Sequence, residues 1–285
     1  MSPPLPPSLL PLSIAGLGFQ VQTPDEGWRA ALAPLYREFP LHGAPDWRVT
    51  LEHAPDLAGA RRIEHQGSVT RFQTHQYAGW IDLEQRRAMT AAASLAAAPA
   101  ALESALAYAC MQALPRTGQG LLLHAAGIHW RGLGLVVSGP AGAGKTTVAG
   151  LAQGHGELFN DEMVIVELAG PRPHLLSTPF VGPTTPPTLA RRSNRRAPAS
   201  VLLLLTHAPT FELTQLSPAE VVLELLRTNL ATVERTASAA AWLAAVERLV
   251  QMLPAYRLHF RPSVELWDFL AGALDAADGG APCAS

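Results

Sequence analysis

A glycine-rich segment, residues 139–147, carries the clearest chemical signature in the chain. It reads Gly-Pro-Ala-Gly-Ala-Gly-Lys-Thr-Thr and satisfies the phosphate-binding pattern G-x-x-x-x-G-K-[ST]. The glycines permit a turn whose N–H groups point inward at a β-phosphate, and the start of a following helix adds partial positive charge. The Lys145 ammonium can reach the β and γ oxygens, and the Thr146 hydroxyl suits a Mg²⁺ ligand. We predict a nucleotide site formed by Gly139, Pro140, Ala141, Gly142, Ala143, Gly144, Lys145, Thr146 and Thr147.

Lys145 is the only lysine in the sequence, against twenty arginines. A lysine at the one position where a phosphate loop needs a compact point charge supports the prediction of a nucleotide site. The same count excludes the guanine signature N-K-x-D, the S-x-x-K serine hydrolases and the V-A-I-K lysine of eukaryotic-type protein kinases. Each of these needs a lysine in another context.

Two adjacent carboxylates, Asp161 and Glu162, follow Asn160 fifteen residues after the loop lysine. Beside a Mg-nucleotide, one can ligate the metal and the other can accept the proton of an attacking hydroxyl. His124, at another predicted strand end, is placed to hydrogen-bond Asp161 or a phosphate. A polar turn and a structural histidine are the alternative interpretations, and the sequence does not decide between them.

Four arginines, Arg191, Arg192, Arg195 and Arg196, crowd one segment after a proline-rich stretch. One interpretation is a mobile flap whose arginine stabilises a transferring phosphoryl group. Another is a docking site for an acidic peptide. A solvated run of charges is at least as plausible from the sequence.

Short apolar strands are predicted on both sides of the glycine-rich loop. Residues 121–124 and 133–138 are expected to pair around a turn at 130–132, and a helix is expected over 146–153. One strand is expected to end at Phe159 and another to cover 163–168, which would place both acids directly after the end of a strand. Further along, we predict a strand at 201–206, a capping box at Ser217, Pro218 and Glu220, helices at 237–252 and 264–274, and a strand at 256–260.

The N-terminal half reads as a smaller α+β region. We predict a strand at 13–22, a helix at 26–39, a strand at 47–51, and strands within 68–81 around a turn at 77–79. An alanine-rich helix should run from Pro99 to Leu114 and end at Pro115. The turn-forming residues Thr117, Gly118 and Gly120 after this helix mark the boundary between residues 1–116 and residues 117–285. Substrate recognition is a candidate role for residues 1–116.

Composition narrows the class of protein. The 285 residues allow one large or two small domains, and the formal net charge of -2 gives no electrostatic reason to expect a nucleic acid or membrane partner. Two cysteines, Cys110 and Cys283, are too few for a disulfide scaffold or a four-thiolate zinc site, and Cys110 reads as a core residue. No signal peptide and no stretch of roughly 20 apolar residues is apparent. We expect a soluble, cytoplasmic protein.

These motifs resemble the HPr kinase/phosphorylase superfamily, in particular HPr-kinase-related proteins of peptide-modification systems. The matching order is a strand with a histidine at 121–125, a hairpin, the loop 139–146, and the segment 158–162 with its hydrophobic pair and two acids. Segments 178–180, 201–205 with 216–220, and 256–262 also match. The resemblance covers about residues 100–270, with the N-terminal part fitting only loosely.

The resemblance implies a P-loop α/β fold, with a mixed sheet and flanking helices, and phosphoryl transfer from ATP. By it, Asp161 is the catalytic base, Thr146 and Glu162 serve Mg²⁺, and His124 orients or polarises the acid. Two departures count against HPr itself as the substrate: the L-E-V-R-G-L-G signature is missing, and Thr147 stands where the family loop has glutamate. The fold is shared with ATP-dependent phosphoenolpyruvate carboxykinase, whose metal site resembles one built with an extra lysine that this chain lacks.

Our main hypothesis is an ATP- and Mg²⁺-dependent kinase acting on a hydroxyl of a peptide, protein or small molecule. Related proteins in lasso-peptide pathways suggest a precursor peptide as acceptor, by analogy alone. The alternatives are a nucleotide-dependent switch or assembly ATPase without an acceptor, and a non-catalytic ATP-binding scaffold. The sequence leaves the acceptor and the oligomeric state open, a homo-oligomer included.

Overall fold

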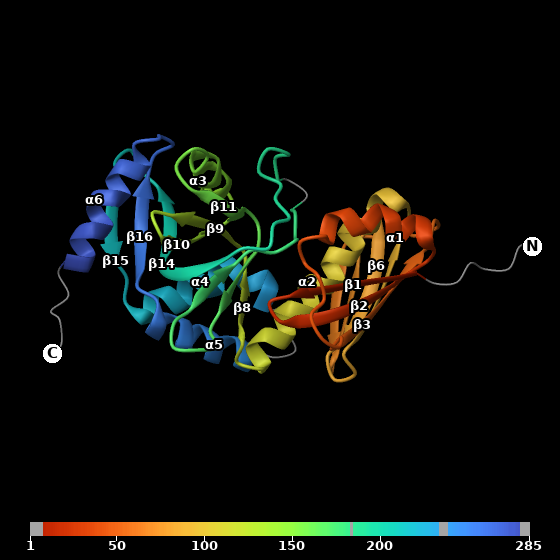
Figure 1. The fold of residues 1–285 in the computed structure, drawn as a ribbon. Coiled ribbons are helices and arrows are strands. Elements are labelled where there is room, and N and C mark those ends of the chain that lie inside the picture. The colour runs from red at the N-terminus through yellow and green to blue at the C-terminus, as the bar shows by residue number, and fades with distance from the viewer. Residues whose placement is uncertain (1–7, 183–184, 234–238, 280–285) are drawn as a thin grey trace, which may run out of the picture.

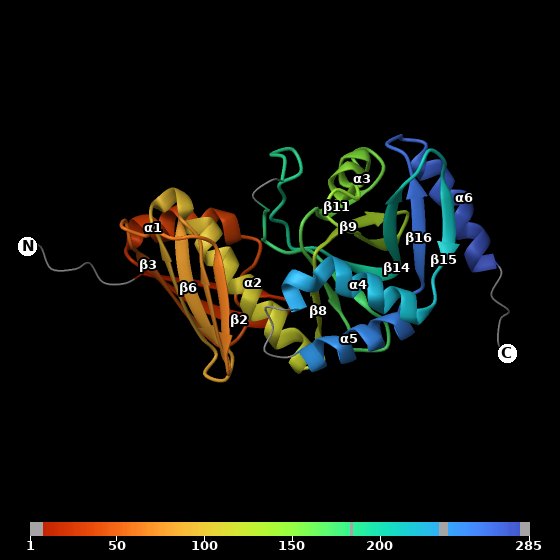
Figure 2. The ribbon, with the colours of Figure 1, turned by 180° about the vertical axis from the view of Figure 1, so that it is seen from behind.

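The computed structural model describes residues 8–182, 185–233 and 239–279. Two β-sheets, each flanked by helices, lie on either side of helix α2 (Ala98–Arg116), as Figure 1 and Figure 2 show. The chain is therefore a mixed α/β protein with mixed sheets and flanking helices, as predicted. None of the described helices is both long and apolar enough to cross a membrane.

The first sheet belongs to the N-terminal half and has the strand order β1-β2-β3-β7-β6-β5-β4. Strand β3 is parallel to both of its neighbours, and the other neighbouring pairs are antiparallel. One face packs against α1 (Glu26–Leu32) and α2, where the side chains of Leu12, Phe19 and Trp47 are buried. The strands are β1 Ser8–Ile14, β2 Leu17–Thr23, β3 Trp47–His53, β4 Arg62–Gln66, β5 Val69–Gln73, β6 Tyr77–Asp82 and β7 Arg87–Ala92, and the 3-10 helices are η1 Ala33–Tyr36 and η2 Leu95–Ala97.

The second sheet carries the predicted phosphate loop and has the order β11-β9-β10-β14-β13-β12-β8, with β16 paired to β14 and β15. Strand β14 is parallel to β10 and to β16. The strands are β8 Gly120–Leu123, β9 Ala125–Trp130, β10 Leu133–Ser138, β11 Glu157–Asn160, β12 Val164–Glu167, β13 His174–Leu176, β14 Arg196–His207, β15 Glu212–Gln215 and β16 Ala255–Phe260. The helices are α3 Lys145–Leu151, α4 Pro218–Val233, α5 Ala239–Met252 and α6 Leu266–Gly279.

Helices cover both faces of this second sheet. On one face, α3 and α6 pack against Val137, Leu203 and Leu258. On the other face, α4 and α5 pack against Val136 and Leu204. Because successive residues of a strand point to opposite faces, the near-continuous apolar runs of β10 and β14 fit a sheet that is buried on both sides.

Helix α2 is buried on nearly all sides. Of its 19 residues, 15 are buried. The hydrophobic cluster that holds 12 of them includes Leu122, Ile165 and Phe180 of the second half as well as residues of the first sheet. A helix that is apolar all round belongs in the interior of a protein. The helix ends at Arg116, but because its packing joins the two halves, a division into domains 1–116 and 117–285 stays a prediction.

Several predicted elements are correct and others need correction. The helix of the capping box exists, since the Ser217 hydroxyl accepts from the Glu220 N–H at 3.4 Å while Glu220 accepts from the Ser217 N–H at 2.9 Å. The strand predicted at 13–22 is wrong, because a turn at Ala15 and Gly16, both with positive φ, divides it into β1 and β2. The helix predicted at 26–39 gives way after Leu32 to a 3-10 turn that contains Pro34.

Two turns were also misplaced. The turn between β5 and β6 lies at 74–76, where the Thr74 hydroxyl accepts from the N–H groups of Gln76 and Tyr77, so 77–79 belong to a strand. The partner of β10 in the hairpin is β9, whereas residues 120–123 form β8 and pair with β12. Pro115 lies within the last turn of α2 and does not end it. The strands β4, β7, β9, β13 and β15 were not predicted.

Candidate functional site

The glycine-rich loop connects β10 to α3 and rests on two aromatic side chains. Gly142 and Gly144 have φ of +79° and +99°, which an L side chain rarely adopts. A Cβ at Gly144 would lie 2.6 Å from Cζ of Phe260 and 3.2 Å from Cε1 of His207. The His207 ring stacks on Phe260 and its Nε2 lies 3.1 Å from the Gly142 carbonyl. Neither residue was predicted to belong to the site, because His207 ends β14 and Phe260 ends β16, far from the loop in the sequence.

Gly144→Ala is expected to lower the free energy of unfolding by about 1–2 kcal/mol and to weaken ATP binding, because the loop must both adopt a strained φ and move away from Phe260. Gly150→Ala is the matched control, since a Cβ at Gly150 has open space and its φ is not left-handed. The control should gain about 0.5–1 kcal/mol of stability. Chemical denaturation and nucleotide titration of both variants test this, and equal stabilities would contradict it.

Lys145 lies folded over the loop. Its Nζ donates to the Gly139 carbonyl at 2.8 Å and to the Pro140 carbonyl at 3.4 Å, and the residue is 8% exposed. Burial lowers the pKa of the ammonium, and the nearby Glu162 carboxylate opposes that shift. Within the described part of the chain no carboxylate is close enough to Lys145 for a salt bridge. The loop therefore holds a buried cation that is free to pair with an anion.

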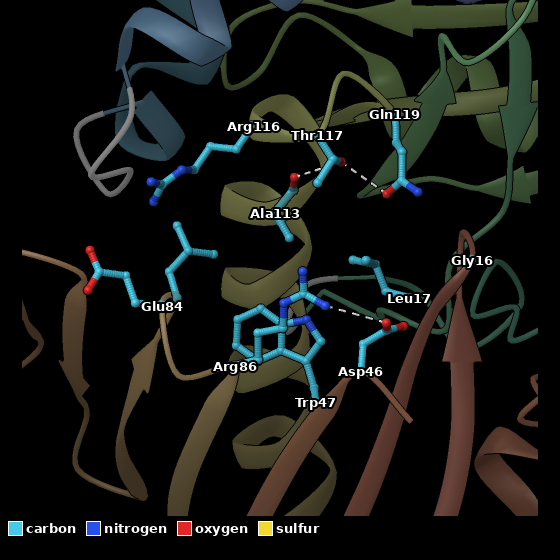
Figure 3. A pocket seen from close by; sticks show the side chains of 11 residues that line it. Gly16, Leu17, Asp46, Trp47, Glu84, Arg86, Ala113, Arg116, Thr117 and Gln119 are labelled. Atoms are coloured by element: carbon cyan, nitrogen blue, oxygen red, sulfur yellow. Dashed lines mark hydrogen bonds and ion pairs between the residues drawn. The ribbon is translucent and has the colours of Figure 1, made fainter. Parts of the chain in front are cut away.

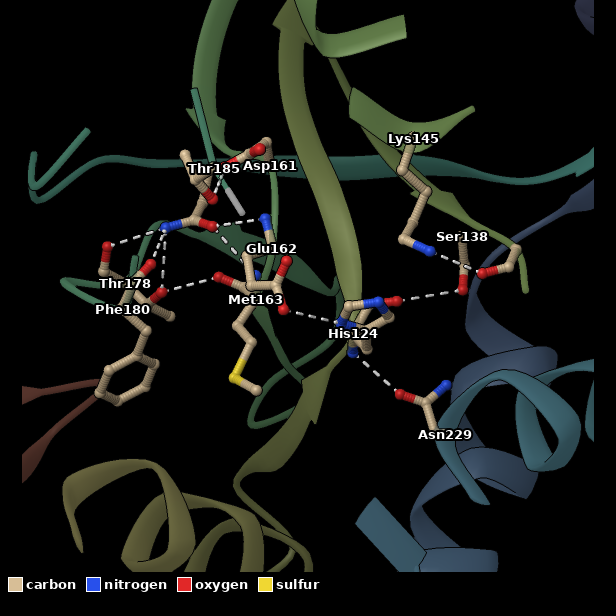
Figure 4. A network of polar contacts seen from close by, with 12 residues as sticks. His124, Ser138, Lys145, Asp161, Glu162, Met163, Thr178, Phe180, Thr185 and Asn229 are labelled. Atoms are coloured by element: carbon tan, nitrogen blue, oxygen red, sulfur yellow. Dashed lines mark hydrogen bonds and ion pairs between the residues drawn. The ribbon is translucent and has the colours of Figure 1, made fainter. Parts of the chain in front are cut away.

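The acid pair is held in place by Asn160, at the end of β11. The Asn160 Oδ1 accepts from the N–H groups of Glu162 at 2.7 Å and Met163 at 2.9 Å. Its Nδ2 donates to the Phe180 carbonyl at 2.8 Å and to the Thr178 carbonyl at 3.3 Å. Figure 4 shows the segment of Glu162 and Met163 beside the segment of Thr178 and Phe180, which these bonds join. A buried asparagine thus builds the turn that presents the acids, so the polar-turn interpretation and the functional one describe the same turn.

Asp161 is nearly enclosed, with 4% of its surface exposed. Its Oδ1 accepts from the Thr185 hydroxyl at 3.1 Å. Burial raises the pKa of this carboxyl, and the bond from Thr185 opposes the rise. A carboxylate whose pKa is raised by burial binds a proton more readily than an ordinary aspartate does, as a general base must.

Glu162 and His124 face each other, with His124 Nδ1 and Glu162 Oε1 3.5 Å apart. Burial and Asp161 raise the pKa of Glu162, and Lys145 lowers it. Burial and the Lys145 charge lower the pKa of His124 to about 4, so its ring is neutral at pH 7. The His124 backbone N–H donates to Asn229 Oδ1 at 2.8 Å, which ties this position to α4. His124 and Glu162 are thus neighbours, and the Lys145 charge acts on both of them, so the three side chains belong to one site (Figure 4).

Thr146 and Thr147 begin α3 and are exposed. Neither hydroxyl has a hydrogen-bond partner among the residues described. The structure thus gathers the loop, its lysine, the two acids and the histidine, and leaves the loop threonines open to solvent.

Most of the arginine cluster is paired with carboxylates of the chain itself. Arg192 donates to Glu103 at 2.7 and 3.1 Å, and Arg195 donates to Glu157 at 2.8 Å. Arg196 pairs with Glu167 at 2.8 Å. Arg191 is exposed, and no partner for it is found in the described residues. These ion pairs hold residues 192–196 to the rest of the molecule, a role that we did not predict for the arginines.

The Arg192 pair fixes the segment that covers the acids. Glu103, buried on α2, accepts from Arg192 and also from the Val181 N–H at 3.0 Å. One residue further along, a Cβ at Gly182 would lie 2.7 Å from Cδ of Glu162. Through Glu103, α2 therefore holds the backbone that lies directly on the Glu162 carboxylate.

Two surface pockets lie away from this site. One of about 270 Å³ lies where the β1–β2 turn, the β6–β7 turn and the end of α2 meet. Figure 3 shows Arg86 reaching across it to Asp46, a separation of 3.6 Å. The other, of about 370 Å³, lies on the first sheet. Neither contains a residue of the predicted site.

One of the two cysteines of the sequence lies in the part of the chain that the structure describes. Cys110 is fully buried in α2, and burial raises the pKa of its thiol, which fits a core residue. Cys283 lies outside the described residues.

Comparisons with known proteins give one informative result. No protein-family model matches the chain. No curated protein matches it either. Among solved structures, the Hpr(Ser) kinase/phosphatase from Coxiella burnetii aligns at 11% sequence identity with a TM-score of 0.33, over 56% of this chain and 99% of that one. Because the TM-score and the identity are both low, the functional proposal rests on the residues of the site.

Proposed function

We propose that this chain is an ATP- and Mg²⁺-dependent kinase that transfers the γ-phosphoryl group to a hydroxyl of a peptide, protein or small molecule. One observation carries the proposal. A buried ammonium on a glycine loop lies close enough to the Glu162 carboxylate for each charge to act on the other, and the nearly enclosed Asp161 carboxylate adjoins Glu162 in the turn after β11. Phosphoryl transfer needs these parts: a cation for the phosphates, oxygen ligands for a metal, and a base.

The residues fit a Mg-nucleotide. The Lys145 ammonium binds only two carbonyls of its own loop, so phosphate oxygens can replace them. The described residues contain no group of three or more His, Cys, Asp or Glu side chains that could hold a metal ion by themselves. Mg²⁺ in such sites takes one or two protein ligands and completes its shell with phosphates and water. Thr146 and Glu162, with Asp161, are the side chains that would hold it, and the ion would neutralise charge on the phosphates.

In the proposed reaction the acceptor oxygen attacks the γ-phosphorus while the bond from that phosphorus to the β-bridging oxygen breaks, and ADP leaves. The acceptor proton passes to the Asp161 carboxylate. Lys145 binds the phosphates through both states and stabilises the charge that shifts to ADP. Neutral His124 orients the Glu162 carboxylate through its Nδ1. The segment at Gly182 packs against one side of the Glu162 carboxylate, whose side chain stays 26% exposed.

Incubation with γ-labelled ATP, Mg²⁺ and sets of hydroxyl acceptors tests the proposal. Serine and threonine peptides, whole proteins and small alcohols form the three sets. Labelled acceptor is the expected product. Release of labelled phosphate without any labelled acceptor would instead indicate an ATPase switch, and tight binding without turnover would indicate a scaffold.

Thr185→Val is expected to move the acidic limb of the pH–rate profile to higher pH. The bond from the Thr185 hydroxyl lowers the pKa of Asp161, so its loss raises that pKa further, and the base becomes protonated, and therefore inactive, at a higher pH. Thr185→Ser keeps the hydroxyl and should keep the wild-type limb. The measurement is kcat/KM against pH for the three proteins. An unmoved limb in the valine variant would show that Asp161 is not the titrating base.

A further inference from the structure

The first sheet has one face without a covering helix. Its other face holds α1 and α2, and α2 separates the sheet from the second half of the molecule (Figure 1, Figure 2). The uncovered face, which we call the open face, consists of the residues that alternate with the buried ones on β1 to β7. It therefore points away from the phosphate loop.

A groove of about 370 Å³ crosses the open face. The strand registers place Leu9, Gln22, Thr50, Met89 and Trp80 side by side along it. Leu9 is 50% exposed, and Met89 and Trp80 are partly exposed. The groove thus offers apolar surface that an extended peptide could cover with its own apolar side chains.

Arginines without partners lie beside this apolar surface. Arg48 and Arg87 stand directly opposite each other on the parallel strands β3 and β7. Arg71 stands opposite Trp80 on β6 and opposite Glu64 on β4, and the Glu64 carboxylate pairs with Arg62. All three are exposed and, within the described ranges, none has a carboxylate partner. Like charges directly opposite in a sheet destabilise it. An anion bound between Arg48 and Arg87 would remove that cost.

Acidic residues on the open face do not cancel this charge. The Asp82 carboxylate faces Arg87 in register, but it accepts from the Ser68 hydroxyl and from backbone N–H groups of the β6–β7 turn. Glu52 is the acidic residue that lines the groove. The groove therefore combines apolar surface with excess positive charge. The arginine pairs of the second half, in contrast, are already satisfied internally.

We propose that the open face docks an extended, acidic segment of a polypeptide acceptor. Carboxylates of that segment pair with Arg48 and Arg87, and an apolar side chain packs on Trp80 and Met89. The inference rests on the proposed kinase function for what happens after docking. Because the open face points away from the loop, the docked segment and the hydroxyl that is phosphorylated belong to different parts of the acceptor.

Binding of a fluorescein-labelled synthetic peptide of alternating Asp and Leu, followed by anisotropy, tests the docking by itself. Wild-type protein should bind it, and added salt should weaken the binding because exposed charges are screened. Arg48→Gln combined with Arg87→Gln should weaken it by about tenfold. Trp80→Ala should weaken it as well. Arg37→Gln, an exposed arginine outside the open face, is the matched control and should bind like wild type. Thermal unfolding of each variant verifies that the fold is kept.

Any one of the following results would overturn the docking proposal. Absence of peptide binding by the wild type is one, and equal binding by the double variant is another. Tighter binding of a single-stranded oligonucleotide would identify a nucleic-acid surface instead. A dimer that the double variant dissociates would identify a second copy as the occupant. Transfer of label to any of the three acceptor sets reports on the kinase separately, so peptide binding without transfer to any of them rejects the proposed function alone, and transfer without peptide binding rejects the docking alone.

Discussion

Replacing Asp161 by asparagine is expected to lower the rate of phosphoryl transfer by about 10²–10⁴-fold while ATP affinity changes by less than about threefold. The amide keeps the size of the carboxylate, and its oxygen can still accept from the Thr185 hydroxyl. What it loses is the ability to take the acceptor proton. Single-turnover transfer and nucleotide titration separate the two effects. Transfer at the wild-type rate would show that the assigned mechanism is wrong.

Lys145→Ala is the contrasting variant. The ammonium is the cation of the loop, so its loss should weaken ATP binding by about 10–100-fold and reduce transfer as well. The two variants together distinguish a residue that acts on the proton from one that acts on the phosphates. If Asp161→Asn weakened ATP binding as much as Lys145→Ala does, Asp161 would be a binding residue instead of the base.

The second large effect is on stability. Arg192→Ala is expected to lower the free energy of unfolding by about 3 kcal/mol, because it leaves the buried Glu103 carboxylate without its cation. Arg196→Ala is the matched control. It breaks the ion pair with Glu167, in which Arg196 is half exposed, and should cost less than about 1 kcal/mol. Urea unfolding of both variants tests the difference, and equal losses would contradict the importance of the Glu103 pair.

The loss caused by Arg192→Ala should also depend on pH. Burial raises the pKa of Glu103, and the Arg192 guanidinium opposes that rise. Without the guanidinium the folded-state pKa rises further above the unfolded value, so the folded state binds the extra proton as the pH falls. The deficit of the variant should therefore shrink at low pH and be largest above neutrality. Replacing both partners by leucine should recover most of the stability, since no charge is then buried.

The local part of the site could be predicted from the sequence. The loop pattern at 139–147 is contiguous, and a strand before it and a helix after it are the context that such a pattern needs. Asp161 and Glu162 were recognised because acids at the end of an apolar run are conspicuous. His124 was recognised as a polar residue at a predicted strand end, and the resemblance to a known family implied its role of orienting or polarising the acid.

The supporting residues were missed because each acts on a partner far away in the chain. His207 and Phe260 support Gly144, and Thr185 bonds Asp161, yet nothing in the local sequence around them indicates it. Asn160 was named only as part of an acidic triplet, although it builds the turn. In the same way, an apolar run such as 121–124 reveals that it is a strand but not which strand it pairs with.

The two-sided packing of α2 limits how the two halves of this chain can have been combined or can be exchanged. A chain begun at Thr117 would expose Leu122, Ile165 and Phe180 to water and would release Val181 and Arg192 from Glu103. A different N-terminal sheet could replace the first one only if it supplied a helix of the same shape with a glutamate at the same place. The N-terminal half therefore completes the packing of the half that carries the glycine loop, and the open face is the part of the first sheet that takes no share in this packing.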